Sequence, residues 1–451
     1  MLCRPLAVDK VELIVQRFSE AAARAAAAGI DALDIHGHTG YLIDQFMSPV
    51  WNRRTDGYGG SVENRCRFAV EVIQAVTAAA PGLPVSFRLS VDHRFPGGRT
   101  AEDSREIALV LERAGLDLMM ADDGSYEAMD YVFPPYYLGD ACMVSAAKAL
   151  KEVLTIPVMA VGNAFFALPL GCAVNAQVGM ELERQVTPAD EPRRVVVVGG
   201  GPAGLEAARV AGLRGHTVDV YERSQQLGGV LWPAATPEFK KELRGMIAWW
   251  ERQIATLPVT VHLGRELTAD SSELDGADAV IVATGSTPIV PAAIPGIDGP
   301  NVVEVVGAHL GAVLGSRVAV AGGGLSGADL ALELAQEGRE VTVVEMADEI
   351  ARDMIIINRI TLLRELAENN VRVLTGHTVT AIDDKGLTAA GPEGEVHIDA
   401  DNVVLAFGVR PATSLTEALA GRDGVVSVGD CVTPAKVGEA INAGFMAALT
   451  I

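Results

Sequence analysis

The first 160 residues alternate between amphipathic helical stretches and short apolar runs. Apolar residues recur at helical spacing over 10–29, 101–114 and 141–153. The apolar runs lie at 32–35, 85–89, 116–120 and 157–161. This alternation predicts parallel strands with helices between them, and polar residues follow the strands as they do at the mouth of a (β/α) barrel. We predict an α/β fold whose residues 1–180 form a partial TIM-type (β/α) barrel of about four strands, or else a small open sheet.

A charged, proline-containing stretch, ELERQVTPADEPRR, follows this region and indicates a linker over 181–192. Beyond it the chain repeats itself once. Val195–Val198 precedes the turn Gly199-Gly200-Gly201-Pro202-Ala203-Gly204, and 123 residues later Val318–Ala321 precedes Gly322-Gly323-Gly324-Leu325-Ser326-Gly327. Each copy is a strand, a glycine turn and a helix, so we predict two Rossmann-like domains after the linker.

Each glycine turn has the spacing of a dinucleotide fingerprint. Gly199 permits a tight turn, Gly201 lets the backbone approach a pyrophosphate, and Gly204 allows close packing of helix on strand. The second copy supplies Gly322, Gly324 and Gly327 at the same spacing. Such turns also occur as plain packing devices, and an acidic residue at the end of the next strand separates the two interpretations.

That acidic residue is present in both copies. Glu222 in VDVYER and Glu345 in VTVVEM each lie 23 residues past the first glycine, where a carboxylate can accept both ribose hydroxyls. No arginine directly follows Glu345, and its charge would repel a 2′-phosphate. The second copy is therefore expected to bind NADH in preference to NADPH.

Composition narrows the class of function. Lys+Arg 36 against Asp+Glu 58 gives a net charge of −22, which disfavours nucleic acid and anionic membranes as partners. No apolar run approaches the roughly 18 residues of a membrane span, and we expect a cytoplasmic protein. The five cysteines are odd in number, scattered and without C-x-x-C spacing, so the sequence indicates neither a disulfide framework nor a zinc site.

Two further strand-end turns, Ala283-Thr284-Gly285 and Gly429-Asp430, complete a family pattern. With the fingerprints they resemble the flavoprotein disulfide-reductase superfamily, in a branch without the redox cysteine pair. The resemblance implies a FAD domain over 193–299 and 403–451 with an inserted NAD(H) domain over 300–402. It implies that FAD is held by Gly199, Gly201, Gly204, Glu222, Arg223 and Gly229, with Asp430 at its ribityl chain. It assigns NADH to Gly322, Gly324, Gly327 and Glu345.

The segment DALDIHGHTGYLIDQFMSPVWNRRTDGYGGSVENRCRF resembles the old yellow enzyme family. Its place ahead of two dinucleotide domains matches the multidomain branch of 2,4-dienoyl-CoA reductase, enoate and bile-acid reductases, and trimethylamine dehydrogenase. The resemblance implies that His36 binds substrate, Tyr41 donates a proton and Arg88 contacts the flavin N1/C2=O edge. It places Gly162 and Asn163 near the FMN phosphate.

The chain departs from this family at several points. The family usually has His or Asn at position 39, whereas this chain has Thr39 with His38 one residue early, and a shifted loop would let His38 substitute. Members of the branch begin with about three more barrel strands, which carry much of the FMN site. Cys172 resembles the last of four ligands to a [4Fe–4S] cluster, but no other cysteine lies at ligand spacing, which predicts that the cluster is lost.

Two functions remain open from the sequence. The first is an NAD(P)H-dependent flavin oxidoreductase that reduces an activated C=C bond in a small enone or enoyl-CoA. The alternative is a non-catalytic or FAD-only remnant, with diaphorase activity or a nucleotide-binding scaffold role. Four barrel strands would leave the strands at 32–35 and 157–161 unpaired at their outer edges, and we expect these edges to favour a homo-oligomer.

Overall fold

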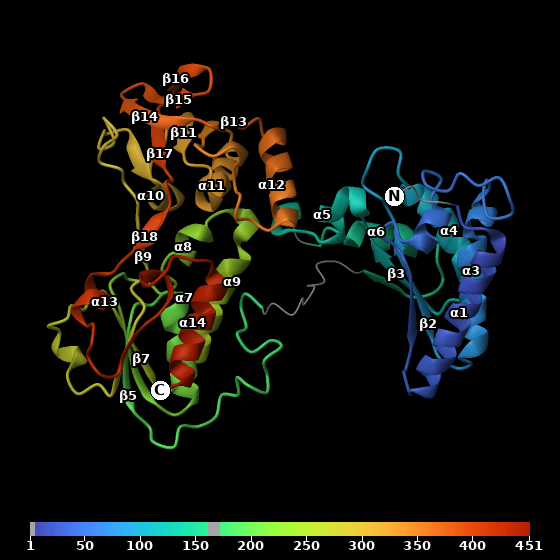
Figure 1. Ribbon diagram of the computed structural model, residues 1–451, viewed down its shortest axis with the longest axis horizontal. Helices are drawn as coiled ribbons and strands as arrows, with labels where there is room; N and C mark the ends of the chain where they lie inside the picture. The colour runs from blue at the N-terminus through green and yellow to red at the C-terminus, as the bar shows by residue number, and fades with distance from the viewer. Residues whose placement is uncertain (1–4, 140, 161–171) are drawn as a thin grey trace. The chain divides into compact units, whose positions relative to one another are not determined.

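The computed structural model describes residues 5–139, 141–160 and 172–451, so Gly162 and Asn163 lie outside the described part of the chain. The chain divides into two compact units, Met1–Phe165 and Phe166–Ile451. Each unit contains parallel β-sheet with helices between the strands, and the second unit has antiparallel strands as well (Figure 1). The predicted α/β class, a partial barrel followed by Rossmann-like domains, is confirmed.

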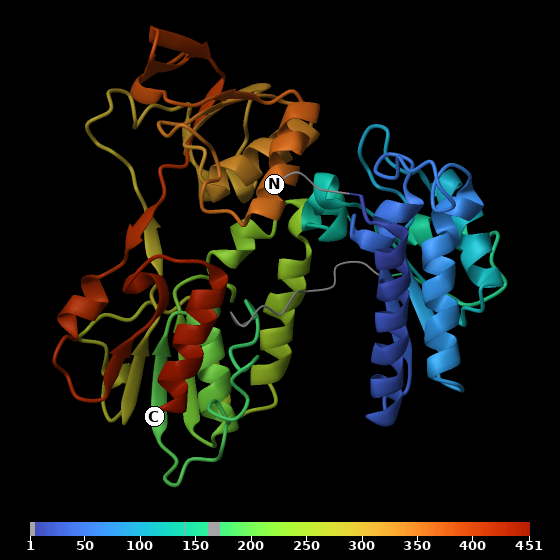
Figure 2. The ribbon, with the colours of Figure 1, turned by 45° about the vertical axis from the view of Figure 1, so that its right-hand side comes forward.

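The first unit is built on a parallel sheet in the order β1-β2-β3-β4. Its strands are β1 (Leu33–Gly37), β2 (Val85–Ser90), β3 (Leu118–Asp122) and β4 (Val158–Ala160). The helices are α1 (Val8–Ala27), α2 (Leu42–Met47), α3 (Val62–Ala79), α4 (Ala101–Arg113), α5 (Met129–Val132) and α6 (Val144–Lys151). The helices α1, α3, α4 and α6 pack on one another in that order alongside the sheet (Figure 2). The structure therefore has the four alternating strands that the pattern predicts.

The core of this unit lies between the sheet and the helices. Phe87, Leu89 and Met119 are fully buried. Along β1, Ile35 is buried while His36 is exposed, because successive strand side chains point to opposite faces. Local signals fix the helices as well: Thr100 and Asp103 form a reciprocal capping box at the start of α4. The strand face opposite the helices is thus left with accessible polar side chains.

The second unit holds two parallel five-stranded sheets. The first has the order β19-β8-β5-β6-β7, from β5 (Arg194–Val198), β6 (Thr217–Glu222), β7 (Val259–Leu263), β8 (Ala279–Val282) and β19 (Val425–Ser427). The second has the order β10-β17-β11-β12-β13, from β10 (Val302–Glu304), β11 (Arg317–Ala321), β12 (Glu340–Val344), β13 (Arg372–Leu374) and β17 (Asn402–Leu405). In both, each fingerprint strand is central and the strand order reverses beside it, which is the position of the ligand crevice in open α/β sheets.

Antiparallel strands complete the second unit. They are β14 (Thr378–Asp383), β15 (Gly386–Gly391) and β16 (Gly394–Asp399), and the pair β9 (Ser286–Pro288) with β18 (Val409–Pro411). The helices are α7 (Pro202–Leu213), α8 (Leu231–Ala234), α9 (Glu242–Ile254), α10 (Val305–His309), α11 (Leu325–Gln336), α12 (Ile356–Glu368), α13 (Ser414–Ala418) and α14 (Val437–Leu449). Figure 1 shows β9 and β18 between the two sheets, as expected where one domain is inserted in another.

Several boundaries differ from the sequence pattern, and two of them bear on the site and on the domains. β1 runs from Leu33 to Gly37 and not over 32–35, so His36 is a strand residue and does not follow the strand. β17 pairs with β10 and β11, so the second sheet extends to Leu405, past the expected boundary at residue 402. Among the described residues, no helix is both long and apolar enough to cross a bilayer.

Candidate functional site

Three aromatic side chains gather at the carboxyl end of β1. The ring centroids of His36 and His38 are 4.2 Å apart, and those of His36 and Tyr41 are 4.8 Å apart. The Tyr41 hydroxyl hydrogen-bonds to that of Tyr126, in η1 (Tyr126–Ala128), although the two residues are 85 positions apart. His36, His38 and Tyr41, singled out from the sequence, thus form one cluster, and the structure adds Tyr126.

Both histidines of the cluster favour the neutral form. Burial lowers the pKa of His38 to about 3, and the Arg88 guanidinium acts in the same direction. Burial and Arg88 also lower the pKa of His36. A neutral imidazole carries one N–H donor and one acceptor nitrogen. At neutral pH these rings therefore offer hydrogen bonds to a ligand without adding positive charge.

Arg88 lies next to His36 across the sheet and is held by a carboxylate. The register of β1 and β2 pairs His36 with Arg88. The Arg88 Nε and Nη2 atoms donate to Asp122 Oδ2 over 3.0 and 2.6 Å. Asp122 Oδ2 also lies 3.4 Å from His38 Nδ1, and burial raises the pKa of this carboxyl group. Asp122 was not among the residues selected from the sequence, because its link to Arg88 depends on the pairing of β2 with β3.

The loop that carries His38 and Tyr41 makes a left-handed turn. Thr39 has a φ of 61° and Gly40 a φ of 77°. The buried Thr39 hydroxyl contacts His38 Nδ1, and the Thr39 N–H donates to Ser90 Oγ over 2.9 Å. His38 is also buried, whereas His36 and Tyr41 are exposed. Position 39, at the left-handed turn, is thus occupied by a threonine whose hydroxyl faces the neighbouring His38.

The first dinucleotide turn has the geometry that its glycines predict. Gly199 has a φ of 114°, and a Cβ on Gly204 would lie 1.9 Å from the Gly199 carbonyl oxygen. A Cβ on Gly201 would have no atom within 4 Å, which leaves open space above this residue. Gly201 begins α7 with no side-chain cap and with Pro202 in the first turn. Open space at an uncapped helix N-terminus suits a pyrophosphate.

The second turn repeats this geometry. Gly322 has a φ of 114°, a Cβ on Gly327 would lie 2.0 Å from the Gly322 carbonyl oxygen, and Gly324 faces open space. The Glu345 carboxylate accepts hydrogen bonds from the Gly323 and Ala347 N–H groups over 2.7 and 2.8 Å.

Glu222 does the same in the first copy. Its carboxylate accepts from Gly200 and Ser224 N–H over 2.7 and 2.8 Å. Each acidic residue therefore lies over its own glycine turn. Arg223, next in the chain, is exposed, and Gly229 lies close to Gly201, since its Cβ would be 3.1 Å from the Gly201 Cα atom.

The remaining two motifs of the first sheet converge. Ser286 directly follows Ala283-Thr284-Gly285, and its hydroxyl donates to Asp430 Oδ2 over 3.3 Å. Asp430 lies in η5 (Gly429–Cys431), where Gly429 has a φ of 71°. The Ala283 carbonyl oxygen faces the Gly199 turn, because a Cβ on Gly199 would meet it at 2.2 Å. The structure thus brings the two motifs and the fingerprint to one end of the sheet.

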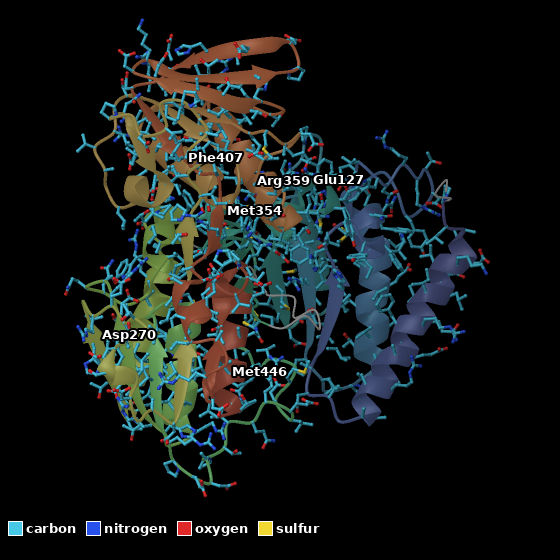
Figure 3. The ribbon with its side chains drawn as sticks, turned by 60° about the vertical axis from the view of Figure 1, so that its left-hand side comes forward. Glu127, Asp270, Met354, Arg359, Phe407 and Met446 are labelled. Atoms are coloured by element: carbon cyan, nitrogen blue, oxygen red, sulfur yellow. The ribbon has the colours of Figure 1, made fainter. Side chains whose placement is uncertain are left out.

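The segment after Glu345 is fixed by α12. Arg359, labelled in Figure 3, donates from Nε to the Ile350 carbonyl oxygen over 2.9 Å and pairs with Glu349 over 3.0 Å.

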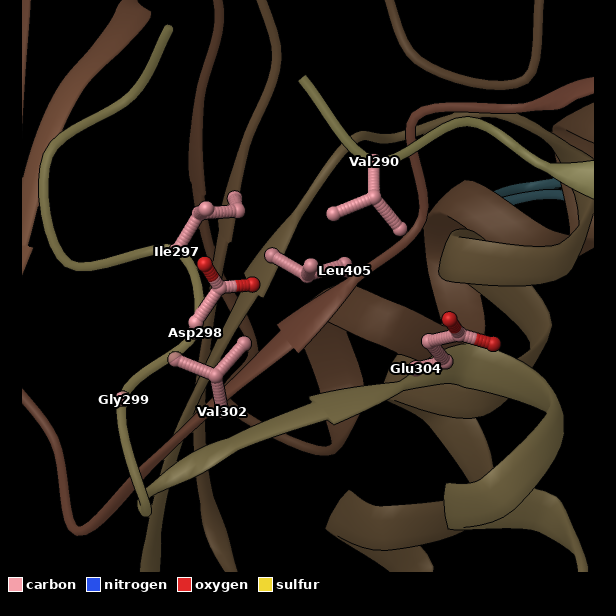
Figure 4. Close-up of a pocket in the computed structure, with 7 residues that line it drawn as sticks. All are labelled: Val290, Ile297, Asp298, Gly299, Val302, Glu304 and Leu405. Atoms are coloured by element: carbon pink, nitrogen blue, oxygen red, sulfur yellow. The ribbon is translucent and has the colours of Figure 1, made fainter. Parts of the chain in front are cut away.

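A pocket of about 250 Å³ lies elsewhere in the same domain, near the ends of β10 and β17. Its lining residues are Val290, Ile297, Asp298, Gly299, Val302, Glu304 and Leu405 (Figure 4). None of them was selected from the sequence.

Cys172 is a free, partly buried thiol. In the part of the chain that the structure describes, no group of three or more His, Cys, Asp or Glu residues gathers where it could hold a metal ion. The described residues therefore do not form the four-thiolate site that a [4Fe–4S] cluster requires.

Comparison with known proteins identifies the family. Residues 2–167 match the NADH:flavin oxidoreductase / NADH oxidase family, and residues 193–430 match the pyridine nucleotide-disulphide oxidoreductase family. The NADH oxidase of Thermoanaerobacter brockii is 34% identical, over 99% of this chain and 79% of the relative. The chain belongs to the NADH:flavin oxidoreductase / NADH oxidase family. Within it, the matches confirm the multidomain old yellow enzyme branch, and they identify flavin and NADH as the cofactors.

Other relatives carry reductase names. The bilirubin reductase of Mediterraneibacter gnavus is 34% identical over 98% of this chain and 78% of its own length. The cinnamate reductase of Clostridium sporogenes is 32% identical over 63% of this chain and 54% of its own length. A solved complex of 2-naphthoyl-CoA reductase with 2-naphthoyl-CoA superposes with a TM-score of 0.93 at 28% identity, covering 100% of this chain and 78% of that chain. These likenesses show a flavin-dependent oxidoreductase fold over the full described chain.

Proposed function

We propose that this chain reduces an activated C=C bond, in an enone or an enoyl-CoA thioester, at the expense of NADH. The observation that carries the proposal is the cluster of His36, His38 and Tyr41 beside Arg88 at the carboxyl ends of β1 and β2. Two of the reductase names among its relatives, cinnamate and 2-naphthoyl-CoA reductase, support this substrate class. The net reaction consumes one proton and moves two electrons from NADH to the alkene.

The chain's own residues account for carbonyl binding and for the proton. His36 and His38 are neutral and offer N–H donors to the substrate carbonyl, which polarises the double bond. The Tyr41 hydroxyl donates its proton to the α-carbon as the enolate collapses. Tyr126 is 54% exposed and hydrogen-bonds to Tyr41, so a proton can be replaced from solvent. A flavin would supply the hydride chemistry when bound, and Arg88 would be the residue of this cluster that holds it.

The second unit fits FAD and NADH. Gly201 and Gly324 each leave open space at an uncapped helix N-terminus, where a pyrophosphate would lie. Asp430 would hold the FAD ribityl chain, and Glu222 and Glu345 would accept the ribose hydroxyls once their carboxylates turn from the backbone. The negative charge of Glu345 favours NADH over NADPH.

An iron–sulfur relay is not part of the proposal. Among the described residues, Cys172 belongs to no group of three or more His, Cys, Asp or Glu residues that could hold a metal ion. The alignment with the T. brockii NADH oxidase spans 515 positions whereas this chain has 451 residues, so at least 64 residues of that relative have no counterpart here.

The test is to purify the full chain, identify its flavins after extraction, and follow anaerobic NADH oxidation with cinnamoyl-CoA or cyclohexenone, using menadione as acceptor for the FAD half alone. We expect NADH-dependent alkene reduction that falls about 10²-fold or more in Tyr41→Phe, because general-acid transfer contributes roughly 10²–10⁴-fold. Tyr58→Phe is the matched control, since Tyr58 is a buried phenol of the same unit bonded to Glu71. Menadione reduction without alkene reduction would support the FAD-only alternative instead.

A further inference from the structure

A fully buried cluster of charged and polar groups lies beneath the loop that carries His38 and Tyr41. Asp44 of α2 is 0% exposed, and its Oδ1 atom lies 2.8 Å from Arg99 Nη1. Arg99 is 1% exposed. His93, also 0% exposed, accepts the Arg99 N–H at Nδ1 over 3.1 Å, so its proton is on Nε2, which lies 3.4 Å from the Asp44 carboxylate.

The cluster holds the backbone of the turn. The Gly40 N–H donates to Asp44 Oδ2 over 2.8 Å, and the preceding N–H, of Thr39, donates to Ser90 Oγ over 2.9 Å. Arg99 contacts both of the residues that accept these hydrogen bonds. Its guanidinium pairs with the Asp44 carboxylate and donates from Nη2 to the backbone carbonyl oxygen of Ser90. Two successive N–H groups of a left-handed turn are thus fixed by residues that one buried arginine joins.

Stability alone does not account for this arrangement. Replacing a buried ion pair by apolar residues of similar volume is often neutral or stabilising, because both charges lose their hydration. A carboxylate at position 44, however, is a strong and directional acceptor for the Gly40 N–H, and Tyr41 is the next residue. We propose that the Asp44–Arg99 pair is a positioning device for the catalytic loop, which sets where the Tyr41 hydroxyl and the His38 ring face the substrate.

The inference rests on the proposed function for its kinetic readout but not for its structural one. In Asp44→Asn, which keeps an oxygen but leaves Arg99 without a charge partner, we expect amide hydrogen exchange over 38–41 to accelerate at least about tenfold. Alkene reduction should fall about 10- to 100-fold in kcat, because small misplacements of a reacting group have effects of that size. NADH oxidation with menadione, which uses the second unit, should not change.

Two further variants make the test decisive. Glu112→Gln is the control, because Glu112 Oε1 accepts the Thr155 and Ile156 N–H groups, before β4 and away from the loop. It should leave exchange over 38–41 and kcat unchanged. The double variant Asp44→Leu with Arg99→Leu removes the pair without leaving a lone charge. We expect it to fold and to show the same faster exchange and lower kcat.

Wild-type exchange over 38–41 and wild-type kcat in the double variant would overturn the proposal, as would unfolding of both Asp44 variants, since the pair would then serve stability. If the wild-type chain reduces no alkene, the proposed function fails. The exchange measurement would still show whether the pair holds the turn.

Discussion

At the scale of single residues, Thr39 is the most unusual member of the site. A β-branched residue at a φ of 61° is sterically unfavourable, at a cost of roughly 1–2 kcal/mol relative to the right-handed region. Its N–H is held by Ser90 and its hydroxyl contacts His38, so the surrounding hydrogen bonds keep it there. Strain of this kind concentrates at functional turns.

Replacing Thr39 by asparagine should relieve the strain, because asparagine tolerates the left-handed region. We expect Thr39→Asn to raise the free energy of unfolding by about 1 kcal/mol and to lower KM for the enone by adding a carbonyl donor. Urea denaturation and steady-state kinetics measure the two effects. Ala141→Gly, at another residue of positive φ, should stabilise the chain without changing KM. A less stable Thr39→Asn protein would mean that the threonine hydroxyl contributes more than its strain costs.

At this cluster the sequence indicated which residues lie together better than it indicated their partners. His36, His38 and Tyr41 stand within six positions, so a short segment suffices to place them together. Asp122 and Tyr126 join the site only through strand register and the loop after β3, at separations of 34 and 85 residues from Arg88 and Tyr41. In the sequence, nothing distinguishes Asp44 from an ordinary polar residue of α2. Its complete burial is seen only in the structure. The spacing of residues along the sequence does not show which distant residues come into contact in the fold.

At the scale of elements, both copies of the strand–turn–helix unit were predicted from the sequence. The glycine spacing fixes both the turn and the tight helix packing, and the structure shows the two copies with the same φ at Gly199 and Gly322. The domain to which β17 belongs was harder to predict from the sequence. An apolar strand that belongs to the second sheet has the same sequence pattern as a strand that begins the next domain. Strand type is a local property, whereas sheet membership is not.

The glycines of one turn should separate packing from ligand binding. In Gly204→Ala the new methyl group would lie 1.9 Å from the Gly199 carbonyl oxygen, so we expect the second unit to lose more than about 2 kcal/mol of stability. In Gly201→Ala the methyl group meets nothing within 4 Å and φ is −80°, so the stability of the flavin-free protein should change little while FAD binding is lost. Thermal unfolding and flavin content measure both. Equal destabilisation in the two variants would contradict this division.

At the scale of the whole molecule, the edges of the first sheet are the unusual feature. Within the described residues β1 pairs only with β2, and β4 pairs only with β3. The Leu33 N–H donates to the Pro84 carbonyl oxygen toward β2, so by the alternation of a parallel ladder the Asp34 N–H points away from the sheet. An exposed edge of this kind is a template for another strand.

We propose that these edges pair with a second copy of the chain, and we expect a dimer by light scattering. Asp34→Pro removes the outward N–H without breaking the bond from Leu33 to Pro84, and proline is tolerated on edge strands, so this variant should be monomeric. Asp31→Pro, in the turn before β1, is the control and should remain dimeric. A monodisperse monomer of the unmodified chain would refute the pairing. Because His36 shares the same strand, dimerisation at this edge should also protect its neighbourhood from hydrogen exchange, which gives an independent readout.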